Sequence, residues 1–361
     1  MGAGGRGISA LSTLERLLLG LIAVLTALAG VANYQAWASV PRFAVATLAL
    51  AGLAWIVSFA TEQLGERFGP ALTGMLQSTL GNLPELFVVI FALQKGELVV
   101  AQTAIIGSIL ANALLVLGLV IVVGARRAPD GIMRFSKRLP RDTATLLQVT
   151  VFIIVLLGLS LGSHDPASHH VKTISAVGAV CLLVVYLAWV VPYLRTDTPE
   201  APGEGRPGPR LSLWLTLGLL GLAGTASAFV SDWFINGLAP AIGTLHISQA
   251  FAGLVIVAIA GNAVENVAGL VLAWKGRSDL AISVVKNSVA QIAAFLFPLL
   301  VLISFALATT LTFSLAPVYI GALALTALAL AQVTGDGEAA AFEGWALVAL
   351  YVILATLTIY E

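Results

Sequence analysis

Long apolar runs separated by short polar stretches make up most of the chain. We count eleven runs, and most have about the 20 residues that an α-helix needs to cross the hydrocarbon core of a bilayer. They cover residues 12–33, 43–60, 68–93, 98–123, 143–162, 172–194, 211–235, 248–274, 279–305, 310–332 and 339–360. Because polarity does not alternate over ten-residue segments, the pattern predicts an all-α polytopic membrane protein with about 11 transmembrane helices.

The first run also fits a second interpretation. Arg6 and Arg16 lie near its start and small residues follow it, as in a cleaved signal peptide. The run is long, however, and the membrane pattern resumes immediately after it. We therefore expect a retained amino-terminal helix.

Composition agrees with a membrane protein and narrows the chemistry. The chain is 59% hydrophobic and 10% charged, with a mean hydropathy of +1.00, whereas soluble domains are about 25% charged. The formal net charge is zero, so nothing indicates nucleic-acid binding. Cys181 is the only cysteine, which excludes an internal disulfide, and the four histidines show no zinc-binding spacing.

The distribution of basic residues predicts the orientation. Most of the eighteen lysines and arginines lie at the amino terminus or in every second loop, while only Arg42, Lys95 and Lys172 lie in the opposite set. Basic loops stay in the cytoplasm, so the amino terminus is expected inside and the carboxyl terminus outside. The lack of targeting features favours a prokaryotic inner membrane.

Residues 196–210 are rich in proline and glycine and are expected to form a cytoplasmic linker. The linker separates a first repeat, residues 39–195, from a second repeat, residues 211–361. Residues 1–38 form an extra amino-terminal helix before the first repeat. Each repeat contains five apolar runs. Because five is odd, the second repeat enters the membrane from the opposite side, and inverted repeats place a binding site near the membrane midplane.

A short polar motif occurs once in each repeat, inside an apolar run. The two copies are Gly81-Asn82-Leu83-Pro84-Glu85 and, 180 residues later, Gly261-Asn262-Ala263-Val264-Glu265. The same offset aligns Lys95-Gly96 with Lys275-Gly276, and Ser108 with Ser288. A duplicated helix pair could use its glycines and asparagines for close packing alone, but packing does not account for a glutamate at each matched position.

A carboxylate inside a membrane costs on the order of 3 kcal/mol and is a functional candidate. In each copy the asparagine and the glutamate are three residues apart and share one helix face, and Ser78 extends that face in the first copy. The downstream helices add polar residues that are costly in a membrane. The candidate ligands are Glu85, Glu265, Asn82, Asn262, Ser108, Asn112, Ser288 and Gln291.

These ligands are all oxygen donors, which Ca²⁺ prefers, and no thiolate or imidazole is placed to favour Zn²⁺ or Cu⁺. Without a cation, two buried carboxylates repel one another and lose solvation, and both effects favour protonation. A divalent cation reverses this balance. Glu85 and Glu265 are therefore expected to bind either Ca²⁺ or protons, which is the physical requirement for exchange.

The motifs resemble the calcium/proton exchanger family of the calcium:cation antiporter superfamily. In the first repeat the similar stretches are Thr61-Glu62-Gln63-Leu64, Gly81-Asn82-Leu83-Pro84-Glu85-Leu86 and Gly107-Ser108-Ile109-Leu110-Ala111-Asn112 with its continuation to Gly118. In the second repeat they are Gly261-Asn262-Ala263-Val264-Glu265, Asp279-Leu280-Ala281-Ile282 and Ser288-Val289-Ala290-Gln291-Ile292-Ala293. Asp336-Gly337 and Glu343-Gly344 near the end are also similar.

The resemblance implies a sodium/calcium exchanger-like fold, with an extra amino-terminal helix and two inverted five-helix repeats. It implies an antiporter, not an enzyme, that exchanges Ca²⁺ for H⁺ across the lipid bilayer by alternating access. Ca²⁺ would be the transported substrate, and no cofactor is expected. Glu85 and Glu265 would bind Ca²⁺ and carry protons, with Asn82 and Asn262 beside them.

The chain departs from the family pattern in its second repeat and in its linker. Asn287 stands where the family has glycine, and Lys286 occupies a normally apolar position. Lys286 either snorkels to the inner interface or pairs with a site carboxylate in place of a cation. The linker lacks the acidic helix of many members, so Ca²⁺ regulation through it is not expected. Glu62 either attracts cations at the cytoplasmic entrance or is an ordinary solvated charge.

Other functions fit parts of this pattern. The same fold could exchange Na⁺ or K⁺ for H⁺, or Na⁺ for Ca²⁺, and a passive channel could use the same ligands. Paired carboxylates could also serve acid/base catalysis in an intramembrane enzyme. A catalyst needs its acid and base in unlike environments, whereas these two copies match. The sequence leaves the oligomeric state open.

Overall fold

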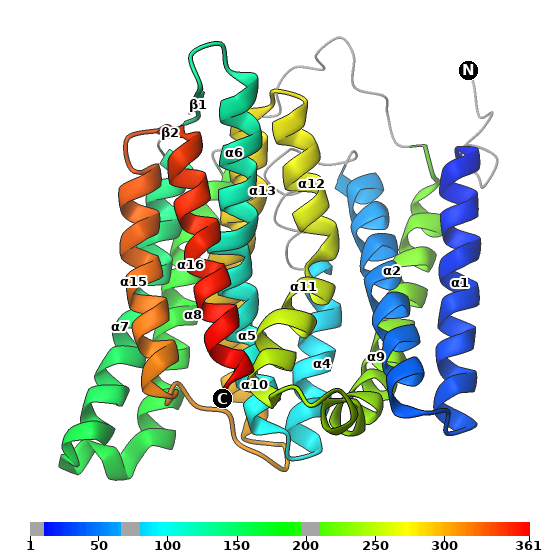
Figure 1. Cartoon of the computed structure of the whole chain (residues 1–361), viewed down its shortest axis with the longest axis horizontal. Helices are drawn as coiled ribbons and strands as arrows, with labels where there is room; N and C mark the ends of the chain where they lie inside the picture. Colours follow the sequence, from blue (N-terminus) through cyan, green and yellow to red (C-terminus); the bar gives the residue numbers. More distant parts are fainter. Residues whose placement is uncertain (1–10, 66–79, 137, 196–209) are drawn as a thin grey trace. The chain divides into compact units, whose positions relative to one another are not determined.

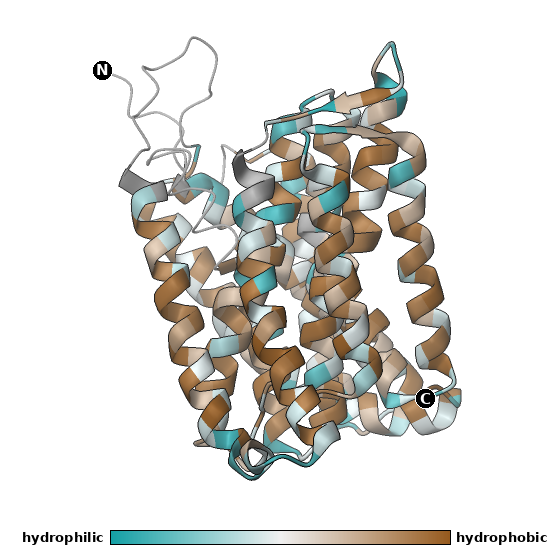
Figure 2. Cartoon of the chain, turned by 90° about the vertical axis from the view of Figure 1, so that its left-hand side faces the viewer, coloured by the Kyte–Doolittle hydropathy of each residue, from teal (hydrophilic) through white to brown (hydrophobic). Residues whose placement is uncertain are grey.

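The computed structural model describes residues 11–65, 80–136, 138–195 and 210–361, and these residues are predominantly helical (Figure 1). Nine helices in this part of the chain are long and apolar enough to cross a membrane, and a bent pair, Gln249–Gly261 with Asn266–Trp274, makes a tenth. The third predicted run, 68–93, corresponds to the shorter α4, and its residues 68–79 lie outside the described residues. Apolar residues follow the lengths of the helices (Figure 2), which confirms an integral membrane protein.

In the first repeat and the helix before it, the elements are α1 (Thr13–Tyr34), α2 (Ser39–Gly65), α4 (Leu83–Gln94), α5 (Leu98–Leu110), η2 (Ala111–Val116), α6 (Leu117–Arg127), β1 (Ile132–Arg134), α7 (Arg138–Ser163), η3 (Pro166–His170) and α8 (Val171–Arg195). In the second repeat they are α9 (Leu213–Leu245), α10 (Gln249–Phe251), η4 (Ala252–Val257), α11 (Ala258–Gly261), α12 (Ala263–Trp274), α13 (Ser278–Gln291), η5 (Ile292–Leu296), α14 (Phe297–Ser304), α15 (Pro317–Thr334), β2 (Glu338–Ala340) and α16 (Ala341–Ile359).

The helix is interrupted at the asparagine of each motif copy. Gly81 and Gly261 are helical, Asn82 and Asn262 form turns, and α4 and α12 then start at Leu83 and Ala263. Both helices have 12 residues. Glycine weakens helical structure, which fits a break directly after Gly81 and Gly261. The matched interruptions show that the two repeats share a backbone conformation as well as a sequence motif at this place.

The turn after each broken helix also repeats. Gly96 and Gly276 both adopt positive φ, at 81° and 74°, a conformation that glycine tolerates best. The following backbone amides make matching bonds, from Glu97 to the Ala92 carbonyl at 2.9 Å and from Arg277 to the Leu272 carbonyl at 3.0 Å. Glycine at these turns is therefore required by the backbone.

In the described part of the chain, three short π-helices interrupt runs that the sequence predicts as continuous helices. These are η2, η4 and η5. A π-helical turn changes the register of all side chains that follow it, and such turns are frequent at functional sites. Here η2 contains Asn112, and η5 starts directly after Gln291. Two candidate ligands thus lie at register changes.

The chain divides into two compact units that do not coincide with its two halves. Unit 1 comprises Met1–Phe91, Trp189–His246 and Ala260–Val264. Unit 2 comprises Ala92–Ala188, Ile247–Ile259 and Glu265–Glu361. In unit 1 the main packing is between α2 and α9, and in unit 2 it includes α6 against α16 and α5 against η4. Each unit draws helices from both repeats.

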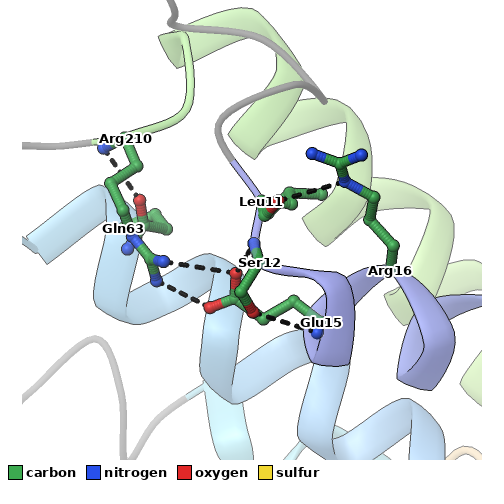
Figure 3. Close-up of polar contacts among 6 residues, drawn as sticks. All are labelled: Leu11, Ser12, Glu15, Arg16, Gln63 and Arg210. Carbon is green, nitrogen blue, oxygen red and sulfur yellow. Dashed lines mark hydrogen bonds and ion pairs between the residues drawn. The ribbon is translucent and has the colours of Figure 1, made fainter.

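Within unit 1, polar contacts join loops that the charge pattern assigns to the same side. Ser39 and Thr244 share a hydroxyl hydrogen bond of 2.9 Å, and Arg42 donates to the Asn236 carbonyl at 2.9 Å. These residues belong to predicted outer loops or helix ends. The predicted inner end has its own cluster around Arg210 (Figure 3).

Within unit 2, polar contacts also join segments that the charge pattern assigns to the same side. The strands β1 and β2, which the sequence did not predict, pair antiparallel and join two predicted inner loops. The backbone N–H of Ser136 donates to Asp279 at 2.6 Å, also between inner segments. Gln249 donates to Glu97 at 3.1 Å between outer segments. The alternation of sides along the chain is therefore consistent with the predicted runs.

In the inner cluster of unit 1, Arg210 connects three parts of the chain (Figure 3). Its guanidinium donates to both Glu15 carboxylate oxygens, at 2.8 and 3.2 Å, and its backbone N–H donates to Gln63 at 3.0 Å. Glu15 also closes a capping box with Ser12 at the start of α1. The cluster therefore holds α1 and α2 at the point where the chain enters α9.

Replacing Glu15 with glutamine should weaken this cluster modestly. The bidentate ion pair is lost, and a partly exposed pair contributes up to about 1 kcal/mol, so the melting temperature in detergent should fall by about 2 °C. Glu338→Gln is the control, because its pair with Arg134 is longer, at 3.4 Å, and more exposed. Equal melting temperatures for the two variants would contradict a stabilising role for the Glu15 pair.

Candidate functional site

Glu85 lies in the first turn of α4 and is only 2% exposed, and Asn82 beside it is also buried. The amino-terminal end of a helix carries a partial positive charge from its free N–H groups. The break at Asn82 therefore creates, inside an apolar run, a place that favours a carboxylate. Among the described residues, the side-chain oxygen of Asn82 accepts no hydrogen bond.

Neighbouring elements of unit 1 fix the start of α4. The Ser231 hydroxyl of α9 donates to the Pro84 carbonyl at 3.4 Å. A Cβ atom placed on Gly261 would lie 3.9 Å from the Glu85 Cβ atom. The first residue of the second motif thus lies close to the glutamate of the first. The start of the second motif and the glutamate of the first are therefore neighbours within unit 1.

Asn262 is buried in the same unit. The backbone of Glu265 lies in the first turn of α12, the position that Glu85 has in α4, while its side chain lies outside the described part of the chain. Ser78 also lies outside the described residues. The structure therefore brings together Asn82, Glu85 and the Gly261–Asn262 turn.

Unit 2 contains the four remaining candidate ligands. The Asn112 side-chain amide donates to the Ser288 hydroxyl at 3.2 Å, and both residues are fully buried. This bond joins η2 of the first repeat to α13 of the second. Ser108 is buried on α5, which runs directly into η2, and Gln291 is buried at the end of α13. The Gln291 side-chain oxygen has no hydrogen-bond partner among the described residues, so it remains available as an oxygen ligand for a cation.

Glu62 and Lys286, the two charged residues for which the sequence left two interpretations open, differ in their surroundings. Glu62 is exposed near the end of α2, as a solvated charge would be. Lys286 is 0% exposed, so its side chain lies inside the protein. Its ammonium group donates to the hydroxyl of Thr334, the last residue of α15. On α13, Lys286 and Ser288 are about 200° apart around the helix axis, which directs them to different neighbours.

Sequence reasoning missed residues that support the site. Thr334 ends an ordinary apolar run, and Ser231 lies in another, so neither has a local signal. Asn266 follows Glu265 directly, and its buried amide oxygen has no partner among the described residues. An amide next to a membrane carboxylate was the available signal for Asn266. Its counterpart in the first repeat is the apolar Leu86.

Two broken helices with a motif glutamate in each first turn, on opposed repeats, are typical of secondary transporters. The class is therefore a membrane transporter. A family model for the sodium/calcium exchanger protein matches residues 38–193 and 214–360. The chain belongs to this family.

Similarity to individual proteins supports the assignment to this family. The vacuolar calcium ion transporter of Schizosaccharomyces pombe is 31% identical, over 90% of this chain and 80% of its own length. The Ca²⁺/H⁺ antiporter ChaA of Bacillus subtilis is 28% identical over 95% of this chain and 98% of its own. The relatives are antiporters, so the chain is a transporter and not an enzyme.

Solved structures confirm the fold. Native YfkE has a TM-score of 0.79 and 26% identity, covering 95% of this chain and all of its own. The sodium-calcium exchanger NCX_Mj has a TM-score of 0.57 at 19% identity, covering 87% of this chain and 97% of its own, which shows a shared fold alone. The chain thus has the predicted sodium/calcium exchanger-like fold.

Proposed function

We propose that this protein is an antiporter that exchanges Ca²⁺ for H⁺ by alternating access. The observation that carries the proposal is the proximity of Gly261 to Glu85, which places one motif's glutamate near the other motif's turn. The names of the relatives, Ca²⁺/H⁺ antiporters among them, support the choice of ions.

Glu85, Glu265, Asn82 and Asn262 would supply the first set of oxygen ligands to Ca²⁺. Ser108, Asn112, Ser288 and Gln291 would complete a set in which amides and hydroxyls outnumber carboxylates. Ca²⁺ takes roughly 6–8 oxygen ligands and tolerates irregular geometry. Two carboxylates would balance its charge, so the ion could enter an otherwise apolar interior.

Proton coupling follows from the same two glutamates. When Ca²⁺ leaves, two carboxylates in a poorly solvated site repel one another, and taking up protons relieves that repulsion. When Ca²⁺ returns, the protons are released. Because the cation and the protons compete for one site, movement in one direction drives movement in the other.

The repeats 39–195 and 211–361 would provide the two access states, with 1–38 as an added helix and 196–210 as a cytoplasmic linker. Inverted repeats generate alternating access when one set of helices rocks against the other around a fixed site. We place the protein in a prokaryotic inner membrane, with its amino terminus in the cytoplasm and its carboxyl terminus outside.

Transport into proteoliposomes tests the proposal. With an acidic lumen, radioactive Ca²⁺ should accumulate, reversing the pH gradient should reverse the flux, and uptake should fall as the pH on the Ca²⁺-loading side drops. Excess Na⁺, K⁺ or Mn²⁺ identifies competing ions. Gradient-driven transport of Na⁺ or K⁺ without Ca²⁺ would replace Ca²⁺ as the substrate. Ca²⁺ flux that moves no protons would indicate a channel and overturn the proposal.

A further inference from the structure

The turn that follows α12 differs chemically from its counterpart in the first repeat, although the two backbones match. Glu97 and Arg277 close the two turns with φ and ψ angles of −81° and 61°, and of −91° and 64°. At the offset of 180 residues, Gln94 corresponds to Trp274 and Glu97 to Arg277. The second turn therefore has an aromatic ring and a cation where the first has an amide and a carboxylate.

An arginine from α6 lies over this aromatic ring. The Arg127 guanidinium carbon is 4.8 Å from the centre of the Trp274 ring, within the range of a cation–π contact. The two residues end α6 and α12, both helices end candidate membrane spans, and they end on the same side of unit 2 (Figure 1). Trp274 is 63% exposed, and tryptophan is enriched at membrane–water interfaces. The contact therefore marks the level of the interface.

Three exposed cations gather at this ring. Lys275 directly follows the tryptophan, and Arg277 precedes α13. With Arg127 they are all exposed, and within the described ranges none of the three has an ion-pair partner. The acid nearest to them in the sequence, Asp279, accepts a backbone N–H at 2.6 Å. Its single charge offsets only one of the three, so the group keeps a net positive charge.

An apolar stripe leads away from the cations along α12. Val267, Val271 and Trp274 are 60%, 43% and 63% exposed, and steps of four and three residues keep them on one face of the helix. At 1.5 Å per residue the stripe is about 10 Å long, while the hydrocarbon layer of one leaflet is about 15 Å thick. The stripe therefore fits part of an acyl chain whose headgroup lies at the end of α12, which favours a phospholipid over a soluble anion.

We propose that Arg127, Lys275 and Arg277 bind the phosphate of an anionic phospholipid, with an acyl chain along Val267 and Val271. Basic residues near a membrane surface attract anionic lipids, and arginine matches the geometry of phosphate with paired donors. The bound lipid connects the ends of α6 and α12. The inference holds whichever ion the protein moves, because no candidate ion ligand takes part.

Native mass spectrometry of the delipidated protein in detergent tests the proposal. Phosphatidylglycerol should bind with a Kd at least about tenfold lower than that of phosphatidylcholine. Each basic residue near the surface contributes about fivefold, so Lys275→Gln and Arg277→Gln should each weaken phosphatidylglycerol binding by about that factor, and the double variant about 25-fold. Both side chains are exposed, so these variants should fold, and their melting temperatures without lipid check this.

Lys95→Gln is the matched control, because it removes the same charge from the same position of the first turn. Its phosphatidylglycerol binding should stay within about twofold of the parent, and millimolar inorganic phosphate should not displace the lipid. Equal affinities for the two lipids, or equal weakening by Lys95→Gln and Lys275→Gln, would overturn the proposal. Displacement by inorganic phosphate would assign the three cations to a soluble anion and also overturn it.

Discussion

Replacing Glu85 with glutamine should reduce Ca²⁺/H⁺ exchange at least a hundredfold. Glutamine keeps the size and one oxygen of the side chain, but it can neither balance the charge of Ca²⁺ nor carry a proton. Glu85 is 2% exposed at the start of a broken helix, where solvent cannot replace the missing charge. Initial rates of gradient-driven Ca²⁺ uptake, measured at equal amounts of reconstituted protein, give the ratio directly.

The matched variants sharpen this test. Glu265→Gln should have an effect of the same order, because Glu265 holds the same position in the second motif. Glu338→Gln serves as the control, since Glu338 belongs to a loop strand and its ion pair is about half exposed. Exchange by Glu85→Gln at more than a tenth of the parent rate would remove Glu85 from the proposed site.

The breaks at the two asparagines were predictable because their causes are local. Glycine lies before each of them, and Pro84 follows the first, so the weakened hydrogen bonding appears in the sequence itself. The second copy of the motif could be identified because it lies 180 residues after the first, at the same offset as other matched residues. Local chemistry and internal repetition together were sufficient to identify the candidate glutamates.

The π-helices were not predictable in the same way. The sequence of η4, Ala252–Val257, is uniformly apolar, and nothing in it distinguishes a π-helical turn from an α-helical one. This segment packs against α5, a contact between segments far apart in the chain. Because the sequence gives no sign of the register change, the direction in which the Asn112 side chain points could not be derived from residue spacing alone.

Lys286 shows the same limit for a single side chain. Sequence position suggested snorkelling, because Asp279 is only seven residues away and marks the inner interface. The partner that holds the ammonium group inside the protein is Thr334, 48 residues further on. A contact with a residue so far along the chain is invisible in the local sequence.

Replacing Gly107 with alanine should destabilise the protein by about 3 kcal/mol or more. A Cβ atom on Gly107 would lie 2.4 Å from the Leu254 carbonyl oxygen and 2.5 Å from the Leu254 Cα atom. Both are backbone atoms of η4, so a side-chain rotation cannot relieve the overlap and the helices must separate. Overpacking typically costs about 1–3 kcal/mol, and a backbone contact belongs at the upper end of that range.

Thermal unfolding in detergent measures this effect, with Gly321→Ala as the matched control. Gly321 lies in α15 of the same unit, and a Cβ atom there would meet nothing within 4 Å. Alanine at that site should leave the melting temperature unchanged or raise it slightly, because alanine favours helices by about 1 kcal/mol over glycine. Similar melting temperatures for the two variants would contradict the close approach of α5 and η4. A fall confined to Gly107→Ala would show that this glycine is needed for the contact that positions the Ser108 and Asn112 helix.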